Sequence, residues 1–254
     1  MSERVFRLSE AEFFLLWQEV HRDTRPVPLG VRHVGFTQAA RARSAEDASR
    51  GLAARGYGTV SRPEPELAGL LHGLAEYEVG LEVVFTARGQ QARGLATVGR
   101  HGAFAGRMGD SVQVTGFRPT ALASTTVGTL PAAPTGTGRS VNVRWEDYLA
   151  AGRAGEEDGA EGFLDVLRGV GMREPEMNTL MRAVTTRSGG GEVAVIARNR
   201  NGYLHHTGDS VSWLDTAEGR YLLRRDRQWL VVTPTDAPRL TSAVETLVAG
   251  AGRN

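Results

Sequence analysis

Two stretches of 25 residues decide how this chain folds. Residues 64–88 read EPELAGLLHGLAEYEVGLEVVFTAR, and residues 174–198 read EPEMNTLMRAVTTRSGGGEVAVIAR. Each begins with Glu-Pro-Glu, a helix start with proline in the first turn, and each ends in a strand that carries the pattern Gly-x-Glu-Val. One offset of 110 residues therefore covers a helix start and the strand after it, which is what an internal duplication leaves in a sequence.

The segments around these stretches follow the same order in both halves of the chain. In each half the sequence predicts a short strand, helices, four further strands and a closing helix. We expect helices at 9–20, 44–56, 63–74, 119–130, 145–151, 163–170, 175–184 and 236–249. We expect strands at 5–8, 81–88, 93–99, 103–108, 111–117, 141–143, 191–198, 203–215, 219–225 and 228–234. Residues 22–43 and 152–162 read as irregular connections.

Two alignments compete beyond the first long strand. The sequence GDSV at 109–112 recurs at 208–211, an offset of 99, whereas four other residues recur at an offset of 118. These four are Arg107, Val114, Thr115 and Leu122, which match Arg225, Val232, Thr233 and Leu240. We prefer the offset of 118, because it places the last hairpin of each half just before its closing helix. The eight extra residues of the second copy then fit in a longer second strand.

The predicted fold class is α+β, with two quasi-twofold-related repeats that each carry a four-stranded antiparallel meander flanked by helices. Residues 1–130 form the first unit, 131–139 (PAAPTGTGR) the linker, and 140–254 the second unit. Together we expect them to form one compact domain. Because one meander with few helices leaves an apolar face, the two sheets must either pack on each other or join edge to edge.

Composition excludes several classes of function. A formal net charge of +1 offers no electrostatic basis for binding nucleic acid or an anionic membrane surface. The absence of cysteine excludes disulfides and thiolate sites and fits the cytoplasm. Acidic residues interrupt the apolar ones in residues 1–20, so no signal peptide is predicted, and no apolar run approaches the ~20 residues of a membrane helix. We therefore expect a cytoplasmic protein with no membrane insertion.

One histidine-rich segment resembles a metal site. His205 and His206 lie close to Asp209 in the sequence. Adjacent side chains on a strand point to opposite faces, so the two histidines do not converge on one ion. We expect no metal here.

Two further patterns resemble catalytic motifs but lack the necessary partners. The Asp-Ser pairs at 110–111 and 209–210 have no base at a fixed spacing, so they read as turn residues. The glycine-rich stretch 135–140 lacks the lysine of a phosphate loop and precedes a strand. We expect no catalytic residues and no cofactor.

An alternative function remains open at this point. Glu82 and Glu192 begin equivalent strands, and they would form a paired-carboxylate site near a pseudo-twofold axis or simply a solvated, ion-paired face. A small-molecule-binding protein or enzyme with a site between the two repeats would use Glu82, Glu192, His205 and Asp209. A purely structural homodimer is a third, weaker hypothesis.

Two hairpin turns offer long polar side chains for binding a partner. Residues 88–93 read RGQQAR and residues 198–202 read RNRNG, at equivalent places in the two copies. Exposed turns on a rigid scaffold commonly carry binding residues. The predicted partner-binding residues are Arg88, Gln90, Gln91, Arg93, Arg198, Asn199, Arg200 and Tyr203.

An ordered series of short motifs gives the chain a family resemblance. The series comprises Phe14, Leu16, Trp17, Pro26, Pro28, Leu130-Pro131, 138–141 (GRSV), 211–216 (VSWLDT), 219–225 (GRYLLRR), Trp229 and 234–236 (PTD). It extends over essentially the whole chain and is similar to the EspG family, the cytosolic chaperones of type VII (ESX) secretion.

The resemblance implies a quasi-twofold α+β fold without catalysis. It also implies a partner, the helical tip of a PPE protein in a PE–PPE pair or an equivalent helical hairpin, which the chaperone keeps soluble and marks for export. In the family, the turn after the first sheet strand and the C-terminal half hold the cargo. Here these correspond to residues 88–93 and to the surface near 198–203. We expect a monomer or weak homodimer.

Overall fold

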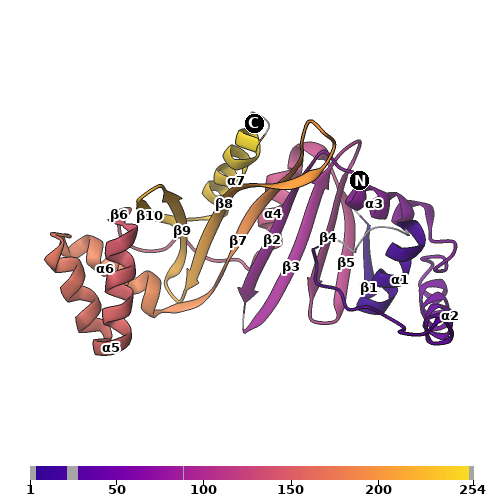
Figure 1. Cartoon of the computed structure of the whole chain (residues 1–254), viewed down its shortest axis with the longest axis horizontal. Coiled ribbons are helices and arrows are strands. Elements are labelled where there is room, and N and C mark those ends of the chain that lie inside the picture. Colours follow the sequence, from indigo (N-terminus) through magenta and orange to yellow (C-terminus); the bar gives the residue numbers. More distant parts are fainter. Residues whose placement is uncertain (1–3, 22–27, 88, 252–254) are drawn as a thin grey trace.

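One large antiparallel sheet forms the centre of the molecule. The computed structural model describes residues 4–21, 28–87 and 89–251. Its ten strands lie in the order β1-β5-β4-β3-β2-β7-β8-β9-β10-β6 (Figure 1). They are β1 (Val5–Ser9), β2 (Val79–Ala87), β3 (Gln90–Val98), β4 (Gly102–Met108), β5 (Ser111–Phe117), β6 (Val141–Arg144), β7 (Arg187–Arg198), β8 (Leu204–Thr216), β9 (Gly219–Asp226) and β10 (Trp229–Thr235). The α+β class is confirmed, and the strands of the two halves join edge to edge.

The register of the sheet follows the offsets seen in the sequence. At its centre β2 pairs with β7, and Val83 lies opposite Val193, 110 positions later. Further out, Gly102 pairs with Phe117 in β4 and β5, and Arg220 pairs with Thr235 in β9 and β10, so both partners shift by 118. The second GDSV lies within β8, whereas the first spans the turn between β4 and β5.

Helix starts follow the capping signals in the sequence. The helices are α1 (Glu10–Val20), α2 (Gln38–Ala54), α3 (Pro65–Ala75), the 3-10 turn η1 (Pro119–Ala121), α4 (Leu122–Gly128), α5 (Trp145–Gly169), α6 (Glu174–Thr185) and α7 (Ala237–Ala251). The capping box before α1 is confirmed: the Glu12 N–H donates to Ser9 Oγ at 3.2 Å, and the Ser9 N–H donates to the Glu12 carboxylate at 2.8 Å.

One predicted connection was wrong in part and the other throughout. Residues 22–27 of the first, 22–43, lie outside the described part of the chain and 28–37 are irregular as predicted, but α2 begins at 38, because Thr37 caps that helix and its Oγ1 accepts the Ala40 N–H at 3.2 Å. The second, 152–162, is helical within α5, and only Gly159 breaks it, with φ +68° and ψ −150°. Its polar residues were read as a loop, but they cover the solvent face of a helix.

The helices form two layers around the sheet. In the first half, residues 4–130, α1, α2 and α3 cover one face through a core that includes Phe13, Trp17 and Leu71. In the second half, residues 140–251, α5 and α6 cover the same face of the sheet around Phe163 and Tyr221. The opposite face, over β2, β3, β7 and β8, is covered by α4 and α7 (Figure 1). Among the described helices, none has both the length and the apolar composition needed to cross a bilayer.

Candidate functional site

The first predicted turn is shorter than expected. Ala87 pairs with Gln90, so Gln90 and Gln91 open β3 and the turn itself contains Gly89, which has φ +75°. Gln90 and Gln91 are exposed, and the Gln91 Oε1 accepts a hydrogen bond from Arg93 Nε at 3.3 Å. Arg88 lies outside the described residues, as does Pro26 of the motif series.

The second predicted turn is organised by one asparagine. The Asn199 Oδ1 accepts the backbone N–H groups of Asn201 at 3.0 Å and of Tyr203 at 2.9 Å. The Asn199 N–H in turn donates to the Tyr203 carbonyl at 2.9 Å. An asparagine side chain that bonds to backbone two and four residues ahead fixes a turn locally. Asn199 therefore shapes this turn from within.

Arg198 anchors the same turn to the sheet, while its neighbours face solvent. Arg198 Nε donates to the Tyr77 carbonyl at 3.2 Å, and its Nη1 donates to the Gly202 carbonyl at 2.5 Å. Burial raises the pKa of Tyr77 from its ordinary value of 10 to about 12. Arg200 is exposed, and Tyr203 presents 71% of its surface to solvent. Arg200 and Tyr203 are thus the side chains of this turn best placed to meet a partner.

The two turns lie at opposite ends of the sheet. The β2–β7 ladder is antiparallel, with Ala87 opposite Gly189 at one end and Val79 opposite Ala197 at the other. The β2–β3 turn follows Ala87, and the β7–β8 turn follows Arg198 (Figure 1). Eight residue steps along a strand separate them by roughly 26 Å. A small ligand cannot contact both turns, whereas an elongated protein can.

The residues of the alternative site do not converge. Glu82 and Glu192 lie on one face of the sheet, two positions apart in register, since Glu82 is opposite Ala194 and Val84 is opposite Glu192. The Glu82 carboxylate instead lies 3.5 Å from Nε2 of His206.

His205 and Asp209 give the alternative site no further support. His205 and His206 pair with successive residues of β7 and so alternate between faces, as predicted. His205, like Asp209, is exposed. The other face of the β2–β7 junction is filled by apolar side chains, among them Val83, Val193 and Trp213. This apolar filling counts against a ligand cavity on that face of the junction.

An open groove beside the β2–β3 turn was not predicted. It has a volume of about 550 Å³ and lies over β1, β5, β4, β3 and β2, with α4 along its side. Phe85, Ala92 and Phe104 form part of its floor, and Val5 and Met108 expose 41% and 47% of their surfaces. Exposed apolar residues that line one hollow mark a binding surface more strongly than scattered ones.

Two glycines keep the floor of this groove open. A Cβ at Gly106 would lie 2.8 Å from the Phe104 ring, and a Cβ at Gly94 would lie 3.1 Å from it. The ring therefore lies across positions where any other residue would displace it. Glycine within strands often marks such a close approach, and this was the available sequence signal.

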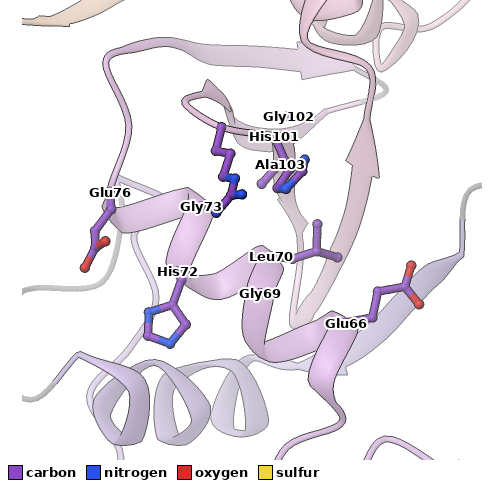
Figure 2. A pocket seen from close by; sticks show the side chains of 10 residues that line it. Glu66, Gly69, Leu70, His72, Gly73, Glu76, His101, Gly102 and Ala103 are labelled. Carbon is purple, nitrogen blue, oxygen red and sulfur yellow. The ribbon is translucent and has the colours of Figure 1, made fainter.

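A second cavity lies between α3 and the turn from β3 to β4. Its volume is about 390 Å³, and Leu70, His72, Glu76 and His101 line it (Figure 2). Sequence reasoning assigned none of these residues to a site, because only the tertiary fold brings His101 of the β3–β4 turn next to α3.

Comparison with known proteins gives the chain a family. The model of the EspG family matches residues 9–246. The fold is similar to that of a solved chain with a TM-score of 0.71 and 16% sequence identity, covering 96% of each chain. That structure is the Mycobacterium tuberculosis type VII secretion system chaperone EspG5 in complex with the PE25-PPE41 dimer. A search of curated proteins finds no match.

Proposed function

Because the chain belongs to the EspG family, we propose that it is a non-catalytic cytoplasmic chaperone for a helical cargo of type VII secretion. The cargo is a PPE-like protein in a PE–PPE pair or an equivalent helical hairpin. The chaperone keeps the apolar end of this cargo soluble and presents it for export. The solved chaperone with the same fold, bound to a PE–PPE dimer, supports this proposal.

The observation that carries the proposal is the apolar groove beside the β2–β3 turn. A helical tip that exposes apolar side chains needs a surface that removes them from water. The groove offers Phe104 and Met108 as apolar contacts. Gln90 lies two residues before Ala92 on β3 and therefore on the same face, where it offers a polar group next to the groove, whereas Gln91 points to the other face. An apolar centre with a polar rim is the usual anatomy of a protein interface.

We assign partner binding to both predicted turns. The first lies beside the groove, and the second would make a more distant contact with the cargo. Arg88, Gln90, Gln91 and Arg93 belong to the end of the sheet that holds the groove. Arg198, Asn199, Arg200 and Tyr203 lie at the other end, where Arg200 and Tyr203 are free to contact a long cargo. An elongated helical cargo would reach from the groove toward the second turn.

We also propose that the chain arose by duplication, with units 1–130 and 140–254 joined by 131–139 into one compact domain. Val83 lies opposite Val193, its own counterpart at the offset of 110, as a twofold axis through the β2–β7 junction requires. The shared offset of 118 in the outer hairpins supports the same origin. The chaperone acts as a monomer or weak homodimer.

Binding of a PE–PPE dimer tests the proposal. The chain and a PE–PPE pair encoded beside a type VII locus are mixed in a calorimeter, and we expect a one-to-one complex with micromolar or tighter affinity. Failure to bind any PE–PPE or helical-hairpin protein of that locus would exclude the function.

A charge placed in the groove tests the surface. Met108→Glu should weaken binding at least tenfold, because the interface would bury an unpaired carboxylate. The matched control is Val170→Glu, since Val170 is 48% exposed at the end of α5, away from the groove. Equal affinity of Met108→Glu and wild type would place the cargo elsewhere.

A further inference from the structure

Three metal-binding side chains meet where α1 and α3 end. One ligand atom from each of His21, His72 and Glu76 lies within 4.8 Å of the other two. His21 follows the last residue of α1, and Glu76 follows the last residue of α3. The group is separate from the groove and from both turns that we assign to cargo binding.

The local structure of α3 explains why two of the three residues face one another. His72 and Glu76 are four positions apart, so they lie on the same side of the helix. Figure 2 shows the His72 ring and the Glu76 carboxylate leaving α3 on the side away from Gly102 and Ala103. Both side chains are exposed, so each can rotate without displacing core residues.

The third residue is held in position by the core. The His21 ring packs against the Trp17 ring at 4.8 Å between centroids and meets the His72 ring edge-on at 5.1 Å. Its Nε2 lies 3.1 Å from the Leu71 carbonyl oxygen. A carbonyl oxygen only accepts, so Nε2 carries the hydrogen of this bond and the lone pair of Nδ1 is left free in the neutral ring.

From this geometry we infer that His21, His72 and Glu76 bind a zinc-class divalent ion. A ligating histidine typically donates its second ring nitrogen to a backbone carbonyl or carboxylate, as His21 does to Leu71. Two imidazoles and one carboxylate are a known zinc ligand set with one position left for water. Imidazole ligands favour zinc, nickel and copper over magnesium and calcium.

The distances need only a small adjustment. Ligand atoms around a tetrahedral zinc ion stand about 3.3 Å apart, compared with the 4.8 Å limit within which these three lie. Rotation of the exposed His72 and Glu76 side chains closes that difference. The bound ion would tie the end of α1 to the end of α3.

Titration of the full chain, freed of any affinity tag, with zinc chloride tests the site. We expect one ion per chain with a micromolar dissociation constant, and no heat with magnesium chloride. His72→Ala and Glu76→Gln should each weaken binding at least tenfold. Both residues are exposed, so these variants should fold normally. Cobalt(II) should give the visible absorption bands of a four-coordinate site in wild type and lose them in His72→Ala.

His101→Ala is the matched control, because His101 lies beside Gly102 and Ala103, on the side of α3 away from the three proposed ligands (Figure 2), and the substitution should leave zinc affinity unchanged. The inference is overturned if zinc binds only at millimolar concentration. It is equally overturned if His72→Ala and Glu76→Gln bind zinc as wild type does, since the ion would then sit on other histidines.

Discussion

The two halves of the sheet hold their helices by different means. In the first half, two buried carboxylates hold the start of α1 in place. Glu10 forms an ion pair with Arg107, and Glu12 forms one with Arg55. In the second half, a buried arginine on β9 fastens the connecting segment. Arg220 is 2% exposed and donates to Asp215 from Nε at 2.6 Å and from Nη2 at 3.1 Å.

The apolar layers differ as well. Within the described residues, the core under α1, α2 and α3 contains 21 buried apolar side chains, and the core under α5 and α6 contains 12. The stability of a smaller apolar core depends more on buried ion pairs and hydrogen bonds. The difference teaches that a symmetric strand order does not require symmetric stabilisation, so the halves should respond differently to matched substitutions.

Loss of the Arg220 side chain should have the largest effect. Besides pairing with Asp215, Arg220 donates from Nη2 to the Pro131 carbonyl at 2.9 Å, so it ties residues 131–139 to the sheet. Arg220→Ala would leave the half-buried Asp215 carboxylate with only the Trp213 Nε1–H as a donor and would remove the side-chain donor of the Pro131 carbonyl, at a cost of about 3 kcal/mol. Urea unfolding followed by circular dichroism measures this change.

Arg224→Ala is the control for this substitution, because Arg224 lies on the same strand and is exposed. It should change the free energy of unfolding by about 0.5 kcal/mol or less. If Arg220→Ala costs no more than Arg224→Ala, the second half does not depend on this arginine.

The stability of the first half should depend on Glu12 more than the stability of the second half depends on Asp147, the residue at the same position in α5. Glu12 is the third residue of α1, accepts the Ser9 N–H and pairs with Arg55. Glu12→Gln should destabilise the fold by about 2 kcal/mol, since hydrogen bonds to a charged group contribute more than neutral ones. Asp147 is the third residue of α5, and Asp147→Asn should cost about 0.5 kcal/mol or less. Equal losses in thermal unfolding would contradict the proposed asymmetry.

Replacing two glycines of α5 by alanine should change the free energy of unfolding in opposite directions. Gly159 has φ +68° and ψ −150°, a conformation that is strained for any other residue. Gly159→Ala should therefore destabilise the protein by about 1–2 kcal/mol. Gly152 has helical geometry, and a Cβ there would meet no atom within 4 Å. Gly152→Ala should stabilise by about 0.5–1 kcal/mol. A stabilising effect of both variants in urea unfolding would show that α5 is not interrupted at Gly159.

Sequence reasoning recovered what depends on local signals. The capping box at Ser9 and the Glu-Pro-Glu helix starts each depend on neighbouring residues, and the offset of 110 follows from comparing two such stretches. It missed the start of α2 because residues 38–43 carry few apolar side chains to reveal a helical period. It identified 131–139 as a linker but did not reveal that Tyr221 holds this segment, since the Tyr221 hydroxyl donates to the Thr137 carbonyl at 3.0 Å.

The candidate site depended on contacts that no local pattern records. The turns at 88–93 and 198–202 were identified from their polar residues, but their separation follows from the antiparallel pairing of β2 with β7. The groove needs β1, β5, β4 and β3 side by side before Met108 becomes part of one surface. His21 and His72 are 51 positions apart and meet only because α1 packs against α3.

The smallest effect should come from Tyr77, where the two halves touch. Tyr77 packs in the core of the first half, which also contains Ile196 of β7. Burial is the main cause that raises its pKa to about 12, from an ordinary value of 10. The neutral hydroxyl is thus favoured in the folded state, and the associated stability is fully present below pH 10. It is lost as the pH rises from 10 through 12, because the unfolded chain releases its proton first.

Thermal unfolding at pH 8 and pH 11 should show a smaller loss of stability for Tyr77→Phe than for wild type. Identical losses in the two proteins would mean that Tyr77 ionises as readily in the folded state as in the unfolded one, and that the junction is more open to water than its burial implies.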